Sequence, residues 1–354
     1  MATRIAIIGG FLGVGKTALV NRTAKGLGAD GKTVGLIVND LGEVLVDTQY
    51  LRAMGHETSE LLRGSFGCRS DDLISSARNM VSRTSPDLII VEPVGTSTDL
   101  LATVVAPLNT MCPGEFEAAP LIIVVDATRM VQERSGPSTL GGSLRKHQIE
   151  EAECLVISKI DMVTRDVLLK LVDEARSLNP QAEVIPYSVI TGHGMDKIMD
   201  VVRSGKGGHR IPVEIDNDSC AHAEAELGWY NGSYGFHAKE KMDTQELATR
   251  ILRAISIWYD PVDIAHAKVM LTSDTNSLKM SAVSDNISVD GIKGSRYAEG
   301  KVTVIINARI RSPPEELLAN IRQFVFEVME AMGQRTEGLN DECFSAPRPT
   351  PPTA

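Results

Sequence analysis

The sequence GFLGVGKT at residues 10–17 directly follows the apolar run IAII at residues 5–8. It has the pattern GxxxxGKT of a phosphate-binding loop between a strand and a helix. Its glycines permit backbone angles that other residues avoid, so consecutive N–H groups can point inward at phosphate oxygens, and the helix that follows adds its positive end. A glycine-rich turn with a chance GKT is the alternative, and both flanking segments argue against it. The residues predicted to bind a nucleotide in this loop are Gly10, Gly13, Val14, Gly15, Lys16, Thr17 and Ala18.

Acidic residues follow two later apolar segments, near the point where each predicted strand ends. Asp40 follows the segment TVGLIV by two positions, and Glu92 directly follows LIIV. Open α/β sheets hold their ligands beyond the carboxyl ends of the strands, so we expect Asp40 and Glu92 to join the Thr17 hydroxyl as ligands of Mg²⁺. Lys16 is expected to lie along the β- and γ-phosphates, and Gly95 to offer its N–H to the γ-phosphate. The predicted catalytic residues are Lys16, Glu92, which orients water, and Asp40.

The segment SKID at residues 158–161 predicts the choice of base. The carboxylate of Asp161 can accept hydrogen bonds from N1–H and the 2-amino group of guanine, whereas adenine lacks that amino group. The stem of Lys159 would cover one face of the base. The segment resembles the Asn/Ser/Thr-Lys-x-Asp element of GTPases, with Ser158 in place of asparagine. Ser188, after the next predicted strand, is placed like the residue whose backbone meets the guanine oxygen in such proteins. The alternative is a helix start that Asp161 caps.

The composition excludes several classes of protein. The chain has 354 residues, 43% of them hydrophobic, which is enough for a large core and suggests two domains. With 46 acidic and 36 basic residues the formal charge is −10, and no block of Lys and Arg appears, so we expect no nucleic-acid partner. Five dispersed cysteines favour a reducing cytoplasm over a disulfide framework. We expect no leader sequence and no membrane association, because no apolar run approaches spanning length.

The order of the predicted elements divides the chain into parts. Strands and helices alternate to about residue 204, which predicts an α/β P-loop domain with a doubly wound, mostly parallel sheet over residues 1–204. Residues 205–216 are expected to be a linker, residues 217–335 a smaller α+β domain with a largely antiparallel sheet that binds a client or regulates, and residues 336–354 a disordered tail. The elements predicted in the smaller domain are helices at 244–259 and 314–332 and strands near 267–272, 278–283 and 302–310.

Further motifs lie at 39–43 (NDLGE), 92–95 (EPVG), 125–127 (VDA) and 148–152 (QIEEA). With the phosphate-binding loop and SKID, they resemble the CobW, UreG and HypB group of P-loop GTPases, and the CobW branch most of all. The resemblance covers about Arg4 to Ser204. It implies binding of GTP and GDP, and GTP hydrolysis that gates a nucleotide-dependent homodimer or a partner complex.

The resemblance also implies a function: a metallochaperone or cofactor-assembly factor that serves a metalloenzyme or a corrinoid (cobalamin) protein. Catalysis is expected to be mostly positioning of phosphate, Mg²⁺ and water. One alternative is a regulatory switch or scaffold with no metal transfer. Another, a small-molecule kinase, is disfavoured because kinases rarely read guanine.

One departure from these relatives concerns a transition metal. They commonly carry C-x-C-C in the segment that matches residues 65–68, where this chain keeps only Cys68. A single thiolate cannot form a closed, thiol-rich zinc site, so we expect at most a weak site of Cys68 with Asp40 and Glu43. The alternative is that Cys68 is a small packed residue. The spacing of Cys220, His222, His237 and His266 is poor, and scattered histidines are the better interpretation.

Overall fold

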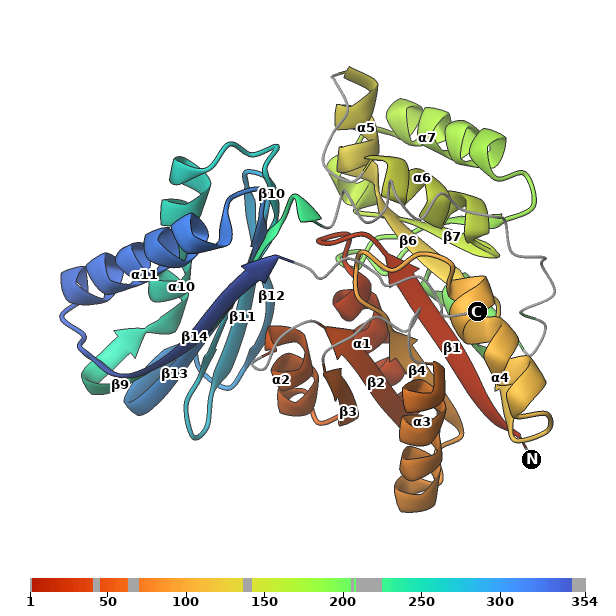
Figure 1. Ribbon diagram of the computed structural model, residues 1–354, viewed down its shortest axis with the longest axis horizontal. Coiled ribbons are helices and arrows are strands. Elements are labelled where there is room, and N and C mark those ends of the chain that lie inside the picture. The colour runs from red at the N-terminus through yellow and green to blue at the C-terminus, as the bar shows by residue number, and fades with distance from the viewer. Residues whose placement is uncertain are drawn as a thin grey trace. The chain divides into compact units, whose positions relative to one another are not determined.

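The computed structural model describes residues 2–40, 45–62, 70–135, 142–204, 207 and 225–345 (Figure 1). Contacts between residues divide the chain into two compact units. The first contains the described residues of 1–40 and 56–221, and the second those of 41–55 and 222–348. The chain therefore leaves the first unit after Asp40, runs through the second as far as Gly55, and returns to the first at His56.

The first unit is built on a parallel sheet in the order β3-β2-β4-β1-β6-β7-β8, with β5 beside β1. Its strands are β1 (Thr3–Gly10), β2 (Val34–Asp40), β3 (Glu57–Leu62), β4 (Leu88–Glu92), β5 (Phe116–Ala118), β6 (Ile122–Asp126), β7 (Cys154–Ser158) and β8 (Glu183–Pro186). All residues of β4, β6 and β7 are buried, which explains why their sequences are continuous apolar runs. This arrangement confirms the predicted α/β fold.

Helices flank this sheet (Figure 1). They are α1 (Lys16–Ala29), α3 (Ser70–Thr84), α4 (Ala106–Met111), α5 (Ala127–Ser135), α6 (Gly142–Glu151), α7 (Arg165–Leu178) and α8 (Met195–Arg203), with a π-helix, η2 (Leu101–Val105), and a 3₁₀ helix, η3 (Ile160–Met162). Because β1, β4, β6 and β7 are parallel, their carboxyl ends meet at one edge of the sheet. That edge carries the loop at residues 10–17, Glu92, Asp126 and Ser158.

The second unit holds an antiparallel sheet in the order β12-β11-β10-β13-β9-β14. Its strands are β9 (Gly228–Asp243), β10 (Ile264–Thr272), β11 (Ser277–Val283), β12 (Asn286–Lys293), β13 (Tyr297–Ile310) and β14 (Thr336–Ser345), and its helices are α2 (Val46–Ala53), α10 (Thr244–Trp258) and α11 (Pro314–Ala331). Side chains on one face of the sheet pack with α10 and α11 into an apolar core that includes Tyr230, Leu252, Val304 and Phe324.

Helix α2 packs against β10, β11 and β13. Lys268, Lys279 and Asn307 alternate along their strands with residues of the core, so they lie on the face away from α10 and α11. The carboxylate of Asp47 pairs with the ammonium groups of Lys268 and Lys279. The N–H of Val46 donates to Asn307 Oδ1 at 2.8 Å. This polar face therefore anchors the helix that follows β2 in the sequence.

The prediction of a disordered tail at residues 336–354 is wrong for residues 336–345. These form β14, which pairs antiparallel with β9 at the edge of the sheet. Its sequence, TEGLNDECFS, has no apolar run: half of its residues are exposed, none is buried, and backbone hydrogen bonds to β9 hold the strand in place. Residues 346–354 and most of the predicted linker lie outside the described residues.

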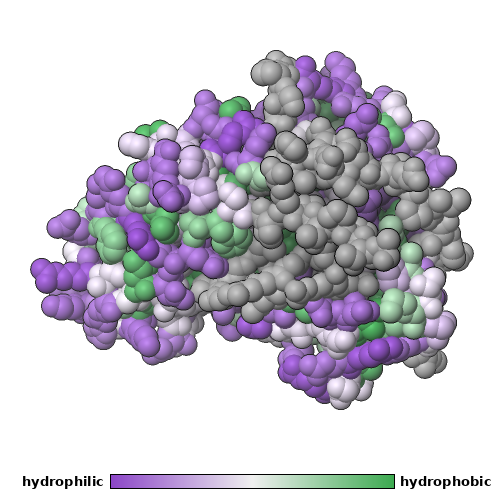
Figure 2. Space-filling view, viewed as in Figure 1, coloured by the Kyte–Doolittle hydropathy of each residue, from purple (hydrophilic) through white to green (hydrophobic). Residues whose placement is uncertain are grey.

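The described surface shows no extended apolar region on the face seen in Figure 2, where hydrophilic and hydrophobic residues are interspersed. Within the described ranges, no helix is long and apolar enough to cross a membrane.

Candidate functional site

The loop at residues 10–17 has the backbone conformation that its glycines predict. Gly10 has φ +130°, and a Cβ there would lie 2.3 Å from the carbonyl oxygen of Val124 on β6, so only glycine fits. Gly15 has φ +97° and precedes α1. The ammonium of Lys16 donates to the carbonyl of Phe11 at 3.1 Å, so this side chain folds back over the loop. The loop thus opens α1 at its positive end, where anions bind.

Thr17 and Glu92, two of the residues predicted to hold Mg²⁺, are in direct contact. The Thr17 hydroxyl donates to Glu92 Oε1 at 2.8 Å, and both side chains are buried. Hydroxyl and carboxylate oxygens are ligands that Mg²⁺ prefers, so these residues fit the ion. The side chain of Asp40 lies outside what the structure describes, and its part in the site stays a prediction.

The loop after Glu92 is held against the phosphate-binding loop. A Cβ at Gly95 would lie 2.9 Å from the backbone nitrogen of Leu12, so the two loops are in direct contact. The side-chain amide of Gln148 on α6 donates to the carbonyls of Gly95, at 3.1 Å, and Ser97, at 2.8 Å. Gln148 is 1% exposed, and its two hydrogen bonds hold the loop at residues 95–97 in place. In the sequence, Gln148 belongs to the motif at residues 148–152, but no structural role is assigned to it there. A motif does not show which backbone groups a side chain will bind.

Ser158 and Lys159 also contact the phosphate-binding loop. The Ser158 hydroxyl donates to the carbonyl of Val14 at 2.7 Å, and the Lys159 ammonium donates to the carbonyl of Gly13 at 3.1 Å. Lys159 has φ +57°, an uncommon conformation for a residue other than glycine. These bonds hold the SKID segment, which is predicted to recognise the base, next to the phosphate-binding loop.

The other two predicted base-binding residues differ in exposure. Asp161, in η3, is exposed. Ser188 is fully buried in the loop after β8, and its hydroxyl accepts a hydrogen bond from the N–H of Thr191 at 3.2 Å. Their contacts with a base stay predictions.

Charged side chains that the sequence did not single out as functional surround the same loop. Asp126, the last residue of β6, pairs with Lys159 at 2.6 Å. Burial raises the pKa of Asp126, but the charge of Lys159 and its hydrogen bond outweigh burial and leave this pKa below its usual value. The guanidinium groups of Arg129 and Arg145 lie 5.5 Å and 5.0 Å from the centre of the Phe11 ring. Burial lowers the pKa of Arg129 to about 10, so the group stays charged at neutral pH.

No transition-metal cluster lies within the described part of the chain, where no three His, Cys, Asp or Glu side chains are grouped to hold an ion. Glu43, Cys68, Cys220 and His222 fall outside that part. The weak site predicted at Cys68 therefore stays a prediction.

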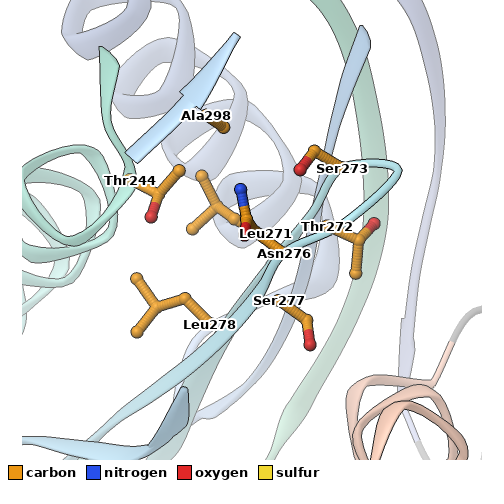
Figure 3. A pocket seen from close by; sticks show the side chains of 8 residues that line it. All are labelled: Thr244, Leu271, Thr272, Ser273, Asn276, Ser277, Leu278 and Ala298. Atoms are coloured by element: carbon orange, nitrogen blue, oxygen red, sulfur yellow. The ribbon is translucent and has the colours of Figure 1, made fainter. Parts of the chain in front are cut away.

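The second unit has a shallow depression beside the β10–β11 turn (Figure 3). Its lining residues are Thr244, Leu271, Thr272, Ser273, Asn276, Ser277, Leu278 and Ala298. It encloses almost no space that is closed off from solvent, so we do not regard it as a small-molecule site.

Comparison with known proteins agrees with the geometry of the first unit. Residues 4–186 match the model of the family described as CobW/HypB/UreG, nucleotide-binding domain. A zinc chaperone CobW from Sinorhizobium sp is 29% identical over 258 residues, which cover 63% of this chain and 72% of that protein. A probable hydrogenase maturation factor HypB from Methanocaldococcus jannaschii is 27% identical over 201 residues, which cover 54% of this chain and 79% of that protein.

Solved structures are more distant. The Zn(II)-bound YjiA GTPase from E. coli matches 92% of this chain and 99% of its own with 16% identity and a TM-score of 0.39. HypB from Helicobacter pylori in complex with nickel matches 60% of this chain and 92% of its own with 15% identity and a TM-score of 0.44. The family match covers more than half of the sequence and includes every loop of the site described above except that of Ser188. The chain therefore belongs to the CobW/HypB/UreG family of P-loop GTPases.

Proposed function

We propose that this GTPase is a metallochaperone or cofactor-assembly factor, in which the nucleotide controls how the second unit presents a metal or cofactor to a client metalloprotein. The names of two relatives, a zinc chaperone and a probable hydrogenase maturation factor, support this class of function. The observation that carries the proposal is the path of the chain: the segment directly after β2 belongs to the second unit. The proposed client is a metalloenzyme or a corrinoid protein.

The hydrolysis chemistry follows from the site. Lys16 would exchange its bond to the Phe11 carbonyl for oxygens of the β- and γ-phosphates, and Glu92 would orient the attacking water. Thr17, Glu92 and Asp40 would hold Mg²⁺, which supplies positive charge opposite the phosphates. Asp161 would select guanine. We expect a nucleotide-dependent homodimer, as the family resemblance implies.

Helix α2 offers a route from the nucleotide to the second unit. Asp40 ends β2 at the edge where the phosphate-binding loop lies, and α2 begins six residues later at Val46. Asp47 is bound by two lysines, the hydroxyl of Tyr50 donates to the carbonyl of Asp290 at 3.4 Å, and the ammonium of Lys279 lies 4.7 Å from the centre of the Tyr50 ring. A change at Asp40 on nucleotide exchange would therefore act on a helix that is fixed to the second unit.

A regulatory switch with no metal transfer would use the same helix, so only metal binding distinguishes the two functions. The full-length protein is loaded with GDP or with a non-hydrolysable GTP analogue and dialysed against Zn²⁺, Co²⁺ or Ni²⁺, and bound metal is measured by elemental analysis. For a metallochaperone we expect at least a tenfold difference in affinity for one of these ions between the two nucleotide states, which corresponds to a coupling of about 1.4 kcal/mol.

Equal affinity in both states, or no binding in either, would favour the regulatory switch. Hydrogen exchange of residues 46–53 in the same samples reports on the helix itself. A difference between nucleotide states in exchange but not in metal binding would identify a switch. A corrinoid protein that co-purifies only in the GTP state would instead support cofactor assembly.

A further inference from the structure

Helix α5 starts beside the phosphate-binding loop and points one arginine at it. Asp126 precedes the helix, and its Oδ1 accepts hydrogen bonds from the backbone N–H of Thr128 at 2.8 Å and of Arg129 at 3.4 Å. This cap fixes the first turn of α5. From that turn the Arg129 guanidinium donates from Nη1 to the carbonyl of Leu12 at 2.9 Å. The side chains of Asp126 and Arg129 are both buried within the first unit.

The bond from Arg129 determines the direction of an N–H group in the loop. A trans peptide is planar, so its C=O and N–H point in opposite directions. Because the guanidinium holds the Leu12 carbonyl, the N–H of Gly13 in the same peptide points away from Arg129. Lys159 and Ser158 act on the next two carbonyls, those of Gly13 and Val14.

Three consecutive peptides of the loop are thus held by side chains that come from the ends of two neighbouring strands, β6 and β7, or from just beyond them. Asp126 connects two of the three supports, because its second oxygen pairs with Lys159 while its first caps the helix that carries Arg129. We propose that Arg129 is a positioning residue for the GTPase reaction, which orients the Gly13 N–H for the phosphates before the nucleotide binds.

The residue type suits this role. The planar guanidinium can lie over the Phe11 ring, 5.5 Å from its centre, while one N–H reaches the Leu12 carbonyl. An ammonium on a lysine stem offers no planar face to the ring. Arg129 is 8% exposed, and the nearby carboxylate of Asp126 helps to keep its charge in the interior.

The test compares Arg129→Met with Arg134→Met, a substitution on the same helix. Arg134 pairs with Glu174 of α7 and is 36% exposed. Affinities for GDP, GTP and IDP, which lacks the 2-amino group, are measured by calorimetry, and folding is checked by the thermal midpoint. We expect Arg129→Met to weaken GDP and GTP by a similar factor, roughly tenfold, because one charge-assisted hydrogen bond is lost. The preference for GDP over IDP should not change, and Arg134→Met should bind like the wild type.

A variant that is merely unfolded would have a lower thermal midpoint. It would lose both its affinity for GDP and GTP and its preference for GDP over IDP. Arg129→Lys covers the case in which the methionine variant does not fold, since it keeps the charge in the interior. We expect Arg129→Lys to bind GDP at least threefold more weakly than the wild type. In the NMR spectrum of the nucleotide-free variant, the amide signal of Gly13 should be shifted from its wild-type position. Wild-type GDP affinity in Arg129→Lys together with an unshifted Gly13 amide would overturn the proposal, as would an equal loss in Arg134→Met.

Discussion

Asp47→Asn tests how firmly α2 is bound to the second unit. The substitution keeps the size of the side chain but removes the charge that faces Lys268 and Lys279. Burial raises the pKa of Asp47, but the two lysines outweigh it and hold this pKa well below its usual value, so the group is ionised at neutral pH. After the substitution two ammonium groups remain, and among the residues that the structure describes only Lys279 has a further carboxylate, Asp290 at 3.5 Å.

The expected loss follows from the burial of these groups. Removing one partner of a buried ion pair costs about 3–5 kcal/mol. Lys268 is 16% exposed and water can partly solvate it, which favours the lower end, about 3 kcal/mol. At about 1.4 kcal/mol for each factor of ten, the fraction of molecules in which α2 is detached should rise roughly 100-fold. Within the described residues, the apolar core of the second unit contains none from α2, so the effect should be local.

Hydrogen exchange followed by mass spectrometry measures this directly. Protection of residues 46–53 should fall about 100-fold in Asp47→Asn, while peptides from α10 and β13 keep theirs. Asp290→Asn is the matched control, because it removes a more exposed carboxylate from the same lysine and should change protection far less. Unchanged protection of residues 46–53 in Asp47→Asn would refute the reasoning, and equal losses in α10 would show that the variant acts through global unfolding.

The same contact has a predictable dependence on pH. A carboxyl group whose pKa is lower in the folded state stabilises above its unfolded value, near 3.9, and its contribution is lost as the pH falls through the lower folded value. Burial lowers the pKa of Lys279, but the charges of Asp47 and Asp290 together outweigh burial and leave this pKa raised, so the contribution of Lys279 is lost only as the pH rises above about 10.4. The protection factor of α2 should therefore stay constant from about pH 5 to 9 in the wild type.

The remaining predictions concern the nucleotide and the metal. Asp161→Asn should shift base preference from guanine toward xanthine nucleotides in calorimetry, because the new amide can donate to the 2-oxo group; equal affinity of the wild type for GTP and ATP would contradict the assigned role. Lys16→Ala should abolish tight nucleotide binding, whereas Glu92→Gln should keep binding and lose most turnover in a phosphate-release assay; full turnover would move the catalytic role to another carboxylate, such as Asp40. The purified protein should carry substoichiometric zinc by elemental analysis, and Cys68→Ala should leave GTP hydrolysis nearly intact; one firmly bound ion per chain that this substitution removes would contradict the expected weak site.

The features of the site that the sequence predicted are those set by local chemistry. Gly10 and Gly15 indicate positions where the backbone has a positive φ angle. The apolar runs before Glu92 and Ser158 predict that each of these residues ends a strand. Because parallel strands end at the same edge, their last residues meet there, and the hydrogen bond between Thr17 and Glu92 is the result. This prediction required no knowledge of which side chains contact each other across the sequence.

The features that the sequence did not predict depend on long-range contacts. Asp47 lies 221 and 232 positions from its two lysines, and nothing in its own neighbourhood marks it as buried. Strand β14 has a polar sequence because it is an edge strand that backbone hydrogen bonds hold to β9. Arg129 follows a strand end by three positions, which is the signal that could have revealed it, but arginine is common in the first turns of surface helices.

The contacts that hold the phosphate-binding loop and the contacts that hold α2 have different expected roles. The supports of the phosphate-binding loop, at the ends of β6 and β7, belong wholly to the first unit, and we expect them to keep the same arrangement in every nucleotide state. The chain after β2 instead enters the second unit, where Asp47 fixes it. Under the proposed function, a change on loss of the γ-phosphate would pass along the chain from Asp40 to Val46, which leads from β2 of the first unit to α2 of the second. If the loop supports moved as well, Arg129→Met would alter nucleotide affinity and the protection of α2 together. We expect it to alter only the affinity, whereas Asp47→Asn should alter only the protection and its response to GTP.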